Sequence, residues 1–259
     1  MNGPETIRSR TNPLIQRVGA VFAGKEDAAL VLEGDRLVDD AIGAGWKLEV
    51  ALVAEDRGAR ASELVSRGVH VKMVERALLD RVSALETSPG ILAIAPKPRG
   101  ADLAAITLDA RTLILVVSGI ADPGNLGALA RTAEAFGVQV LAALAGGASP
   151  WNEKALRGSM GSLLRVPVVT GITADACAAL LEKRGVRQVC AATRGGADPA
   201  RFDWKGPLAL WVTGETGVMP ASAMRFEKLT ISMAKGVESL NVTVAASVLL
   251  FSAGRSARG

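Results

Sequence analysis

Hydrophobic runs bounded by glycine or proline alternate along the chain with stretches in which hydrophobic residues recur at helical spacing. Strand-length apolar runs that alternate with helical stretches are typical of an α/β fold. No internal repeat and no low-complexity block interrupts this alternation. The pattern therefore predicts an α/β protein.

The first part of the chain is predicted to form a compact unit of alternating helices and strands. Helices are expected at Leu37–Ala44, Ala61–Arg67 and Ala77–Leu85, and strands at Leu48–Val53, Val69–Val74 and Ile91–Ala95. Pro96 and Pro98 then begin a stiff polar stretch that ends at Gly100, and neither proline can continue a helix or a central strand. We therefore predict two domains, residues 1–98 and residues 105–259.

The second part begins with Thr112–Val117, a continuous apolar run suited to a strand buried on both faces of a parallel sheet. A helix is expected at Asn125–Phe136, stopped by Gly137, and the next strand at Val138–Leu144. The remaining predicted elements are helices at Ala174–Lys183 and from Val242 to about Ala253, and strands at Gln188–Thr193, Leu208–Val212 and Leu229–Ser232. The basic tail, Gly254–Gly259, is expected to be disordered.

Composition excludes several classes of protein. The 259 residues are 49% hydrophobic, which is enough for cores that need no covalent support. Two cysteines, Cys177 and Cys190, and one histidine, His70, are too few for a disulfide framework or a zinc site, so no structural metal is expected. The segment Met1–Arg10 is polar and no apolar run approaches membrane-spanning length, so we expect a cytosolic protein.

The charge favours an anionic partner. The formal net charge is +4, and 21 of the 30 basic residues are arginine, which binds phosphate in a planar fork. The alternative is that so much arginine merely reflects a biased source composition. With 3% aromatic residues and no tyrosine, base-stacking platforms for single-stranded nucleic acid are disfavoured.

Polar residues gather in three loops of the second part, each directly after a predicted strand. In open α/β sheets ligands bind beyond the carboxyl ends of the strands, so the loops after Val117, Val212 and Met233 are the expected site. The chain has neither GxGxxG nor GxxxxGK[ST], which disfavours a dinucleotide-dependent oxidoreductase and a P-loop enzyme. His70 lies outside these loops, so a Ser-His-Asp site is also disfavoured.

The three loops resemble the motifs of the SpoU/TrmH family, the RNA 2′-O-ribose methyltransferases of the SPOUT superfamily, in the TsnR-like two-domain form. The first motif corresponds to Asp122–Gly137 and the third to Ile231–Val242. The N-terminal part, with Ser9–Pro13 and Glu33–Gly34, resembles the family's ribosomal-protein-like substrate domain. Three positions depart from the family pattern: Thr213 and Val218 replace glycines of the second motif, and Ser232 replaces a proline.

The resemblance implies an N-terminal α/β substrate domain and a SPOUT α/β domain with a C-terminal trefoil knot, a rare exception to unthreaded chains. It also implies a homodimer in which the arginine of the first motif reaches the partner's site. S-adenosylmethionine is the implied cofactor, held largely by backbone groups of Thr213, Gly214, Gly217, Ile231, Met233 and Leu240. The implied catalytic residues are Asn125, Arg131, Glu215, Ser239 and Asn241, with no metal.

Each of these residues has a simpler structural alternative. Asn125, and either Ser239 or Asn241, could cap the helix that follows, Arg131 could be a solvated helix residue, and Glu215 could cap a turn. Glu134, one turn beyond Arg131, is left out of the catalytic set because it could pair with Arg131 or face solvent. In the first domain Arg8, Arg10 and Arg17 are candidate RNA contacts, and a solvated surface is the alternative.

The expected function is methylation of a ribose 2′-hydroxyl in structured RNA, with rRNA favoured over tRNA as the partner and no membrane involved. A catalytically silent RNA-binding or ribosome-assembly protein on the same scaffold remains the alternative, because Thr213, Val218 and Ser232 depart from the family pattern. An oxidoreductase is a weaker third possibility, because the dinucleotide motif is missing.

Overall fold

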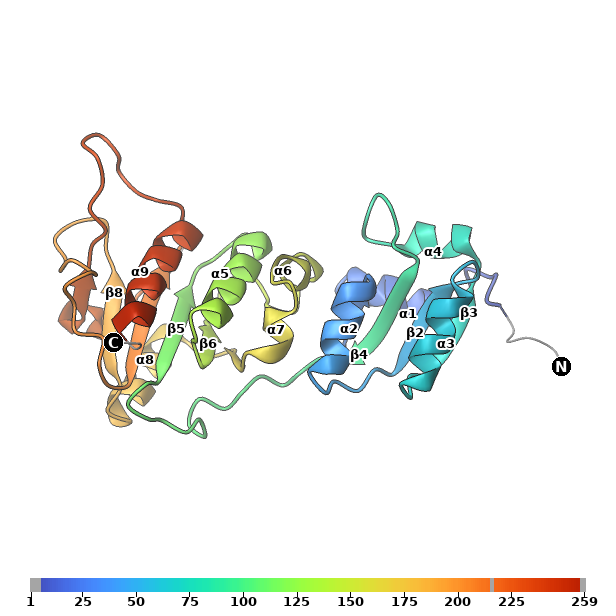
Figure 1. The fold of residues 1–259 in the computed structure, drawn as a ribbon, viewed down its shortest axis with the longest axis horizontal. Helices are drawn as coiled ribbons and strands as arrows, with labels where there is room; N and C mark the ends of the chain where they lie inside the picture. The colour runs from blue at the N-terminus through green and yellow to red at the C-terminus, as the bar shows by residue number, and fades with distance from the viewer. Residues whose placement is uncertain (1–5, 215–216, 257–259) are drawn as a thin grey trace. The chain divides into compact units, whose positions relative to one another are not determined.

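The chain forms two compact units, Met1–Pro98 and Arg99–Gly259 (Figure 1). The computed structural model describes residues 6–214 and 217–256. The division falls inside the proline-containing stretch that precedes Gly100. Both units combine helices with a sheet, which confirms the predicted α/β class.

The first unit is a four-stranded mixed sheet in the order β1-β4-β2-β3. Strand β4 pairs antiparallel with both β1 and β2, whereas β2 pairs parallel with β3. The elements are α1 Pro13–Phe22, β1 Ala29–Glu33, α2 Asp35–Gly43, β2 Val50–Ala54, α3 Gly58–Ser66, β3 Val71–Val74, α4 Arg76–Val82 and β4 Ile91–Pro96. The apolar residues of β1, β2 and β4 and the helix faces that cover them form the core.

The first two elements of this unit were not predicted from the sequence. Helix α1 begins at Pro13, and the side chain of Asn12 caps it by accepting from the backbone N–H of Leu14 at 3.0 Å. An N-cap asparagine followed by proline at the first helical position is a helix start, so the signal was present. Strand β1 is buried along its whole length, and the apolar run Ala29–Leu32 was its signal.

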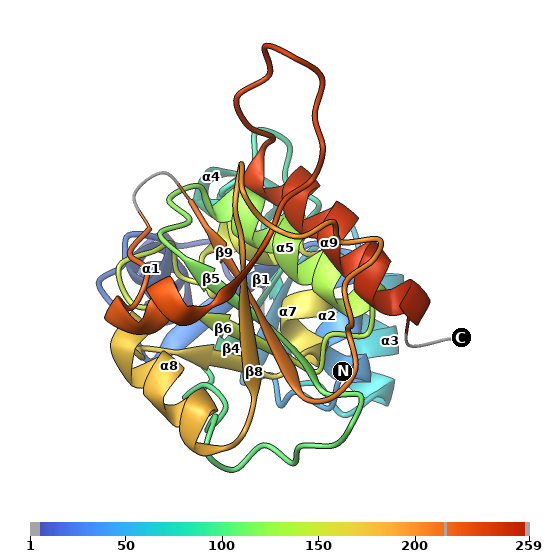
Figure 2. The same ribbon diagram turned by 90° about the vertical axis from the view of Figure 1, so that its left-hand side faces the viewer.

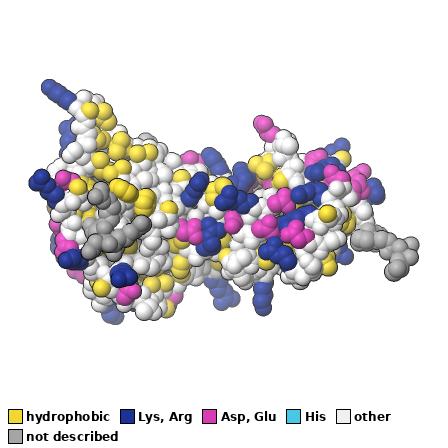
Figure 3. Space-filling model, in the orientation of Figure 1, with side chains coloured by type: hydrophobic (Ala, Val, Ile, Leu, Met, Phe, Trp, Pro, Cys, Tyr) yellow, Lys and Arg dark blue, Asp and Glu magenta, His cyan; other side chains and the backbone are white. Residues whose placement is uncertain are grey.

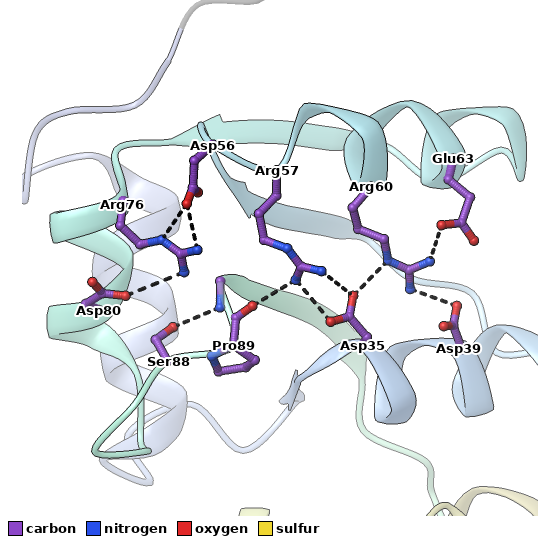
Figure 4. A network of polar contacts seen from close by, with 11 residues as sticks. Asp35, Asp39, Asp56, Arg57, Arg60, Glu63, Arg76, Asp80, Ser88 and Pro89 are labelled. Carbon is purple, nitrogen blue, oxygen red and sulfur yellow. Dashed lines mark hydrogen bonds and ion pairs between the residues drawn. The ribbon is translucent and has the colours of Figure 1, made fainter.

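A network of arginines and carboxylates joins α2, α3 and α4 in the first unit (Figure 4). Arg60 is the centre of one half, with Asp35 at 3.0 Å, Asp39 at 2.8 Å and Glu63 at 2.7 Å. The Arg60 side chain is only 9% exposed, and these carboxylates offset the desolvation cost of burying its charge. The hydrogen bonds from Arg60 and Arg67 lower the pKa of Asp39 in spite of its partial burial, which acts in the opposite direction.

The second unit contains a six-stranded sheet in the order β10-β8-β9-β5-β6-β7, in which every pairing is parallel. The strands are β5 Leu113–Ser118, β6 Val140–Ala143, β7 Val168–Thr170, β8 Arg187–Ala191, β9 Leu208–Thr213 and β10 Glu227–Leu229. The helices are α5 Pro123–Ala135, α6 Glu153–Gly158, α7 Ser162–Arg165, α8 Ala174–Lys183, the 3-10 helix η1 Ala221–Arg225 and α9 Val242–Ser256. The central strand β5 is buried along its length, as its apolar sequence predicted.

Helices α5 and α9 lie side by side on one face of the parallel sheet, and α8 covers the other face (Figure 2). Helix α5 ends as predicted, because Gly137 adopts a positive φ of 76°. There the N–H of Val138 donates to Ala133 and the N–H of Gly137 donates to Glu134. Helix α9 runs to Ser256, so the expectation of disorder from Gly254 onward was wrong for Gly254–Ser256, and the last three residues lie outside the described ones.

The last strand is placed differently from the prediction. We expected a strand at Leu229–Ser232, whereas β10 spans Glu227–Leu229. After Leu229 the backbone N–H of Thr230 donates to Ala197, a residue of the loop after β8, at 3.0 Å. The chain therefore leaves the sheet one residue into the predicted strand.

The two cysteines are buried as free thiols in the second unit. Burial raises the pKa of the Cys177 thiol to about 12 and also raises the pKa of Cys190. Across the part of the chain that the structure describes, no helix has both the length and the apolar character needed to cross a bilayer.

Glu134 on α5 pairs with Arg165 and not with Arg131. Its carboxylate accepts from Nε of Arg165 at 2.6 Å, from Nη2 of the same residue at 2.8 Å and from the hydroxyl of Ser162 at 2.6 Å. The bond to Arg165 is the main cause that lowers the pKa of Glu134, while burial acts against it. The pair ties α5 to α7, and the earlier alternatives of an Arg131 pair or free solvation were wrong.

We expect Glu134→Gln to lower the free energy of unfolding by about 1 kcal/mol at pH 7, a value kept small because the pair is about one-third exposed. The folded pKa lies below the unfolded one, so this stabilisation is present above the unfolded value of about 4.3 and is lost as pH falls through the folded pKa. Urea unfolding at pH 7 and at pH 3.5 measures the difference. Glu227→Gln, at an exposed position, is the control, and an equal deficit of Glu134→Gln at both pH values would contradict the assignment.

Candidate functional site

A cavity of about 670 Å³ lies where β5, β8 and β9 end, at the carboxyl edge of the parallel sheet. Neighbouring parallel strands end at the same edge, so the loops that follow them meet there. The lining comprises Gly119, Ile120, Ala121, Asp122, Asn125, Ala191, Ala192, Thr193, Val212, Thr213, Gly214, Leu229, Ile231, Met233, Ser239, Leu240, Asn241, Val242, Ala245 and Leu249. Pockets of this size and mixed character are suited to small-molecule ligands.

The loop after β5 forms the first wall. Asp122 caps α5 by accepting from the backbone N–H of Gly124 at 3.2 Å, and it also accepts from Nζ of Lys154 at 2.7 Å. The hydrogen bond from Lys154, followed by that from Gly124, lowers the pKa of Asp122. Asn125 therefore lies inside the first turn of α5, half-buried in the cavity wall, and the alternative that Asn125 is the N-cap was wrong.

The loop after β9 forms the second wall and touches the first wall backbone to backbone. The N–H of Gly214 donates to the carbonyl of Ser118 at 2.8 Å. A Cβ atom on Gly214 would lie 2.3 Å from the carbonyl oxygen of Gly119, and a Cβ on Gly217 would lie 2.5 Å from the carbonyl oxygen of Ser118. Only glycine permits this approach, so the two loops pack against each other through their backbones.

The two β-branched departures in this loop fit without backbone strain. Met160 is the only non-glycine residue with a positive φ in the described chain, so Thr213 and Val218 adopt ordinary backbone conformations. Thr213 lines the cavity, and its hydroxyl donates to Sδ of Met219 at 3.0 Å. Val218 is 68% exposed, does not line the cavity, and is held by Ser118, whose hydroxyl accepts from its N–H at 3.1 Å and donates to its carbonyl at 2.7 Å.

The segment before α9 forms the third wall. Asn241 caps α9, because its side-chain oxygen accepts from the N–H of Thr243 at 2.9 Å and from that of Val244 at 3.4 Å. The capping alternative is thereby confirmed for Asn241, which also lines the cavity together with Ser239 and Leu240. Capping uses the oxygen of the Asn241 amide, and its NH₂ group remains a donor.

A fourth wall, which was not predicted from the sequence, consists of Ala191–Thr193, where β8 ends. Thr230 fixes this wall to the segment after β10. Its hydroxyl donates to the carbonyl of Ala192 at 3.0 Å and accepts from the N–H of Gly196 at 2.9 Å. The rule on the carboxyl ends of parallel strands applies equally to β8, so it would have indicated this wall had it been applied to every strand.

The cavity brings most of the predicted site residues together. The residues found in its lining are Asn125, Thr213, Gly214, Ile231, Met233, Ser239, Leu240 and Asn241. Gly217 lies behind the second wall in contact with Thr213 and Ser118. Glu215 lies outside the described residues, and Arg131 is not part of the lining.

Arg131 lies on the exposed side of α5, beyond the cavity wall formed by Asn125. Its neighbour Thr132 contacts α9, with the hydroxyl oxygens of Thr132 and Ser247 at 3.4 Å. Within the described parts of the chain no carboxylate pairs with the Arg131 guanidinium. Arg131 is therefore exposed on α5 and does not line the cavity of its own chain.

The candidate RNA contacts of the first unit have different surroundings. Arg8 pairs with Glu55 at 3.1 Å, and Arg17 pairs with Glu26 at 2.8 Å and also with Glu49. The bonds to Glu49 and Glu26 raise the pKa of Arg17 further above its ordinary value. Arg10 is exposed, with no carboxylate partner among residues 6–214 and 217–256.

The arrangement is suited to an organic ligand with both polar and apolar parts. Backbone groups and the short polar side chains of Asn125, Ser239 and Asn241 share the lining with Leu229, Leu249 and other apolar residues. Among the described residues no group of three or more His, Cys, Asp or Glu side chains could hold a metal ion.

Comparisons with known proteins match both units. Residues 112–251 match the SpoU rRNA Methylase family, and residues 24–93 match the MRM3-like substrate binding domain. The chain is 30% identical to the 23S rRNA (guanosine-2'-O-)-methyltransferase RlmB of Xanthomonas campestris, over 97% of this chain and 99% of the relative. It is 27% identical to the 23S rRNA (guanosine(2553)-2'-O)-methyltransferase RlmP of Bacillus subtilis, over 85% of this chain and 86% of the relative.

Solved structures resemble the whole chain. An AdoMet-bound rRNA methyltransferase from Sinorhizobium meliloti has a TM-score of 0.85 at 25% identity, with 97% of each chain covered. The SpoU methyltransferase AviRb from Streptomyces viridochromogenes, in complex with the cofactor AdoMet, also has a TM-score of 0.85 at 25% identity. That match covers 96% of this chain and 99% of the AviRb chain.

Proposed function

Because the chain belongs to the SpoU rRNA methylase family, we propose that it transfers a methyl group from S-adenosylmethionine to a ribose 2′-hydroxyl of ribosomal RNA. The observation that carries the proposal is the cavity of about 670 Å³, whose lining contains residues of all three predicted loops. The relatives named above are 23S rRNA 2′-O-methyltransferases, and two of the similar structures contain AdoMet.

The residues of the cavity fit this cofactor. The close approach of Gly214 to Gly119 leaves no room for a side chain at position 214, where the loop lines the cavity. Backbone groups of Thr213, Gly214, Ile231, Met233 and Leu240 would hold the cofactor, with Gly217 supporting the loop. Of the three departures that kept a silent scaffold open, Val218 and Ser232 do not line the cavity. Thr213 does line it, in an ordinary backbone conformation and with its hydroxyl bound to Met219.

The cofactor, when bound, supplies an electrophilic methyl group, and the chain's task is to orient the ribose hydroxyl and the group that accepts its proton. Asn125, Ser239 and the NH₂ group of Asn241 lie in the lining and would orient this hydroxyl. A guanidinium stays protonated in proteins, so Arg131 is a poor general base. In the proposed mechanism Arg131 holds the ribose hydroxyl and an adjacent RNA phosphate, and the phosphate takes the proton. The proposal also keeps Glu215 as a catalytic residue and Arg10 as an RNA contact.

The proposal includes a homodimer formed through the α5–α9 layer. Val244, Val248 and Phe251 expose 49%, 38% and 51% of their surface along one stripe of α9, and hydrophobic side chains gather there in Figure 3. Exposed apolar stripes of this kind mark interaction surfaces. Since Arg131 is exposed on α5 of the same layer, a second copy would bring it toward the partner's cavity.

The proposal further includes a C-terminal trefoil knot and a cytosolic location, where an rRNA substrate is found.

We expect Val248→Asp to raise the dimer dissociation constant at least 100-fold, because an unpaired carboxylate buried at an interface costs about 3 kcal/mol or more. Sedimentation velocity over a concentration series measures this constant. Val65→Asp is the control, since Val65 is 58% exposed on α3 of the first unit and lies outside the α5–α9 layer. A Val248→Asp protein that dimerises as tightly as the control would contradict this interface.

The activity is tested by incubating the protein with methyl-labelled S-adenosylmethionine and total ribosomal and transfer RNA, followed by mapping of the product. We expect label at a 2′-O position of ribosomal RNA. Calorimetric titration with the cofactor provides an independent measurement, and we expect saturable binding. Saturable cofactor binding without methyl transfer to any RNA would favour the silent scaffold and contradict the proposed function.

A further inference from the structure

The basic charge of the protein is concentrated in the catalytic unit. Residues 1–98 contain 13 basic and 14 acidic residues, which gives this unit a formal charge of −1. Residues 99–259 contain 17 basic and 12 acidic residues, which gives a formal charge of +5. RNA affinity depends mainly on cations that contact phosphates. The excess of cations nevertheless lies in the catalytic unit and not in the unit that matches a substrate-binding domain.

Most arginines of the first unit are also engaged with carboxylates. Arg57, Arg60 and Arg76 bind aspartates in the network of Figure 4, and acidic and basic side chains intermingle over this unit in Figure 3. Arg8 and Arg17 have glutamate partners. A guanidinium that already binds a carboxylate gains little from a phosphate, since the carboxylate must first be displaced.

Two exposed basic residues of the catalytic unit follow lining residues of the cavity closely in the chain. Arg194 directly follows the lining residue Thr193, and Lys235 lies two residues after the lining residue Met233. Both are exposed, and none of the described carboxylates pairs with either of them, although Glu238 belongs to the same loop as Lys235. Lys235 is the only basic residue of the loop between β10 and α9.

Lys228, although it is close in sequence, does not belong to this pair. Its neighbour Leu229 lines the cavity, and successive side chains of a strand point to opposite faces of the sheet. Lys228 pairs in register with Cys190, a member of the core cluster beneath α8. Lys228 therefore faces the α8 side, away from the cavity.

The loops that bear Arg194 and Lys235 are fastened to each other. The backbone N–H and the hydroxyl of Thr230 both bind the segment from Ala192 to Ala197, at distances between 2.9 and 3.0 Å. A Cβ on Gly196 would lie 2.6 Å from the carbonyl oxygen of Lys228, so the two backbones are in direct contact. The two cations are thus carried by loops that share one anchor at Thr230.

We propose that Arg194 and Lys235 bind phosphates of the RNA strand on either side of the nucleotide that enters the cavity, and that this rim supplies much of the electrostatic affinity for RNA. The inference rests on the proposed function, because it takes RNA as the partner. The rim holds the strand across the mouth of the cavity, where Asn125, Ser239 and Asn241 meet the ribose.

The test compares two double variants of the full chain that lose the same charge. Arg194→Gln/Lys235→Gln removes the rim cations, whereas Arg111→Gln/Lys205→Gln removes two exposed cations beside the amino ends of β5 and β9, at the opposite edge of the sheet. The probe is fluorescently labelled, fragmented ribosomal RNA, titrated between 50 and 300 mM salt. Cofactor affinity is measured beside it by calorimetry.

We expect the rim variant to bind RNA about tenfold more weakly near physiological salt, with a salt slope reduced by about 1.5, since each phosphate contact contributes about 0.7–0.9 to the slope. The control variant should keep a slope close to that of the unsubstituted protein, and cofactor affinity should be unchanged in both. Equal salt slopes for the two variants would overturn the proposal that Arg194 and Lys235 bind RNA phosphates. An unsubstituted protein that does not bind the probe would overturn it as well. Failure of the proposed function has a different signature, namely RNA binding that depends on the rim without any methyl transfer.

Discussion

Replacement of Arg131 by lysine is expected to lower the single-turnover rate of RNA methylation about 100-fold, the usual cost of one preorganised donor at a reacting oxygen. Lysine keeps the positive charge but loses the planar fork that can hold a hydroxyl and a phosphate oxygen together. Arg131→Ala should lose at least as much. Because Arg131 is not part of the cavity lining, both variants should bind the cofactor with unchanged affinity.

The measurement is single-turnover methylation of the mapped RNA, with calorimetric cofactor titrations on the same preparations. Arg111→Lys is the matched control, because Arg111 is an exposed arginine at the opposite edge of the same sheet. A sharper test mixes Arg131→Lys with a second inactive variant that is altered in the cavity. If Arg131 acts in the cavity of the partner, the mixed dimers should recover part of the activity. A near wild-type rate for Arg131→Lys would show that Arg131 is only a solvated helix residue.

The sequence was most informative where structure depends on local pattern. The apolar run of β5 and the glycine that ends α5 are local signals, and both elements formed close to the predicted positions. The omission of α1 was a failure to use a local signal, because Asn12 and Pro13 form the same cap-and-proline start as Asp122 and Pro123. The misplaced start of α5 at Asn125 has the same cause.

Other features could not be read from periodicity, because they join residues far apart in the chain. Thr230 holds the loop after β8, and Glu134 pairs with Arg165 of α7 although Arg131 is its near neighbour on the helix. A side chain's direction is equally invisible in the sequence. The departures Thr213 and Val218 looked equivalent, yet Thr213 lines the cavity while Val218 faces solvent.

The glycine at position 214 carries the second large prediction. Its backbone lies so close to the loop after β5 that a Cβ would be 2.3 Å from the carbonyl oxygen of Gly119 and 3.0 Å from the carbonyl carbon. Both contacts are backbone atoms, which cannot rotate away, so one loop must move. Gly119, Ile120, Thr213 and Gly214 all line the cavity, and a shift of either loop therefore reshapes it.

We expect Gly214→Ala to weaken cofactor binding about ten- to 100-fold, since forcing extra atoms into a close-packed contact costs about 1–3 kcal/mol. Isothermal titration with S-adenosylmethionine measures this, and circular dichroism verifies that the sheet is intact. Gly254→Ala in α9 is the matched control, because there the same methyl group meets Phe136 at ordinary contact distances, a ring carbon at 3.8 Å and the carbonyl oxygen at 3.9 Å, and alanine favours the helix. The control should therefore bind the cofactor as the unsubstituted protein does. If Gly214→Ala bound the cofactor with unchanged affinity, the backbone contact between the two loops would have no part in the binding site, and the cavity would have to be occupied in another way.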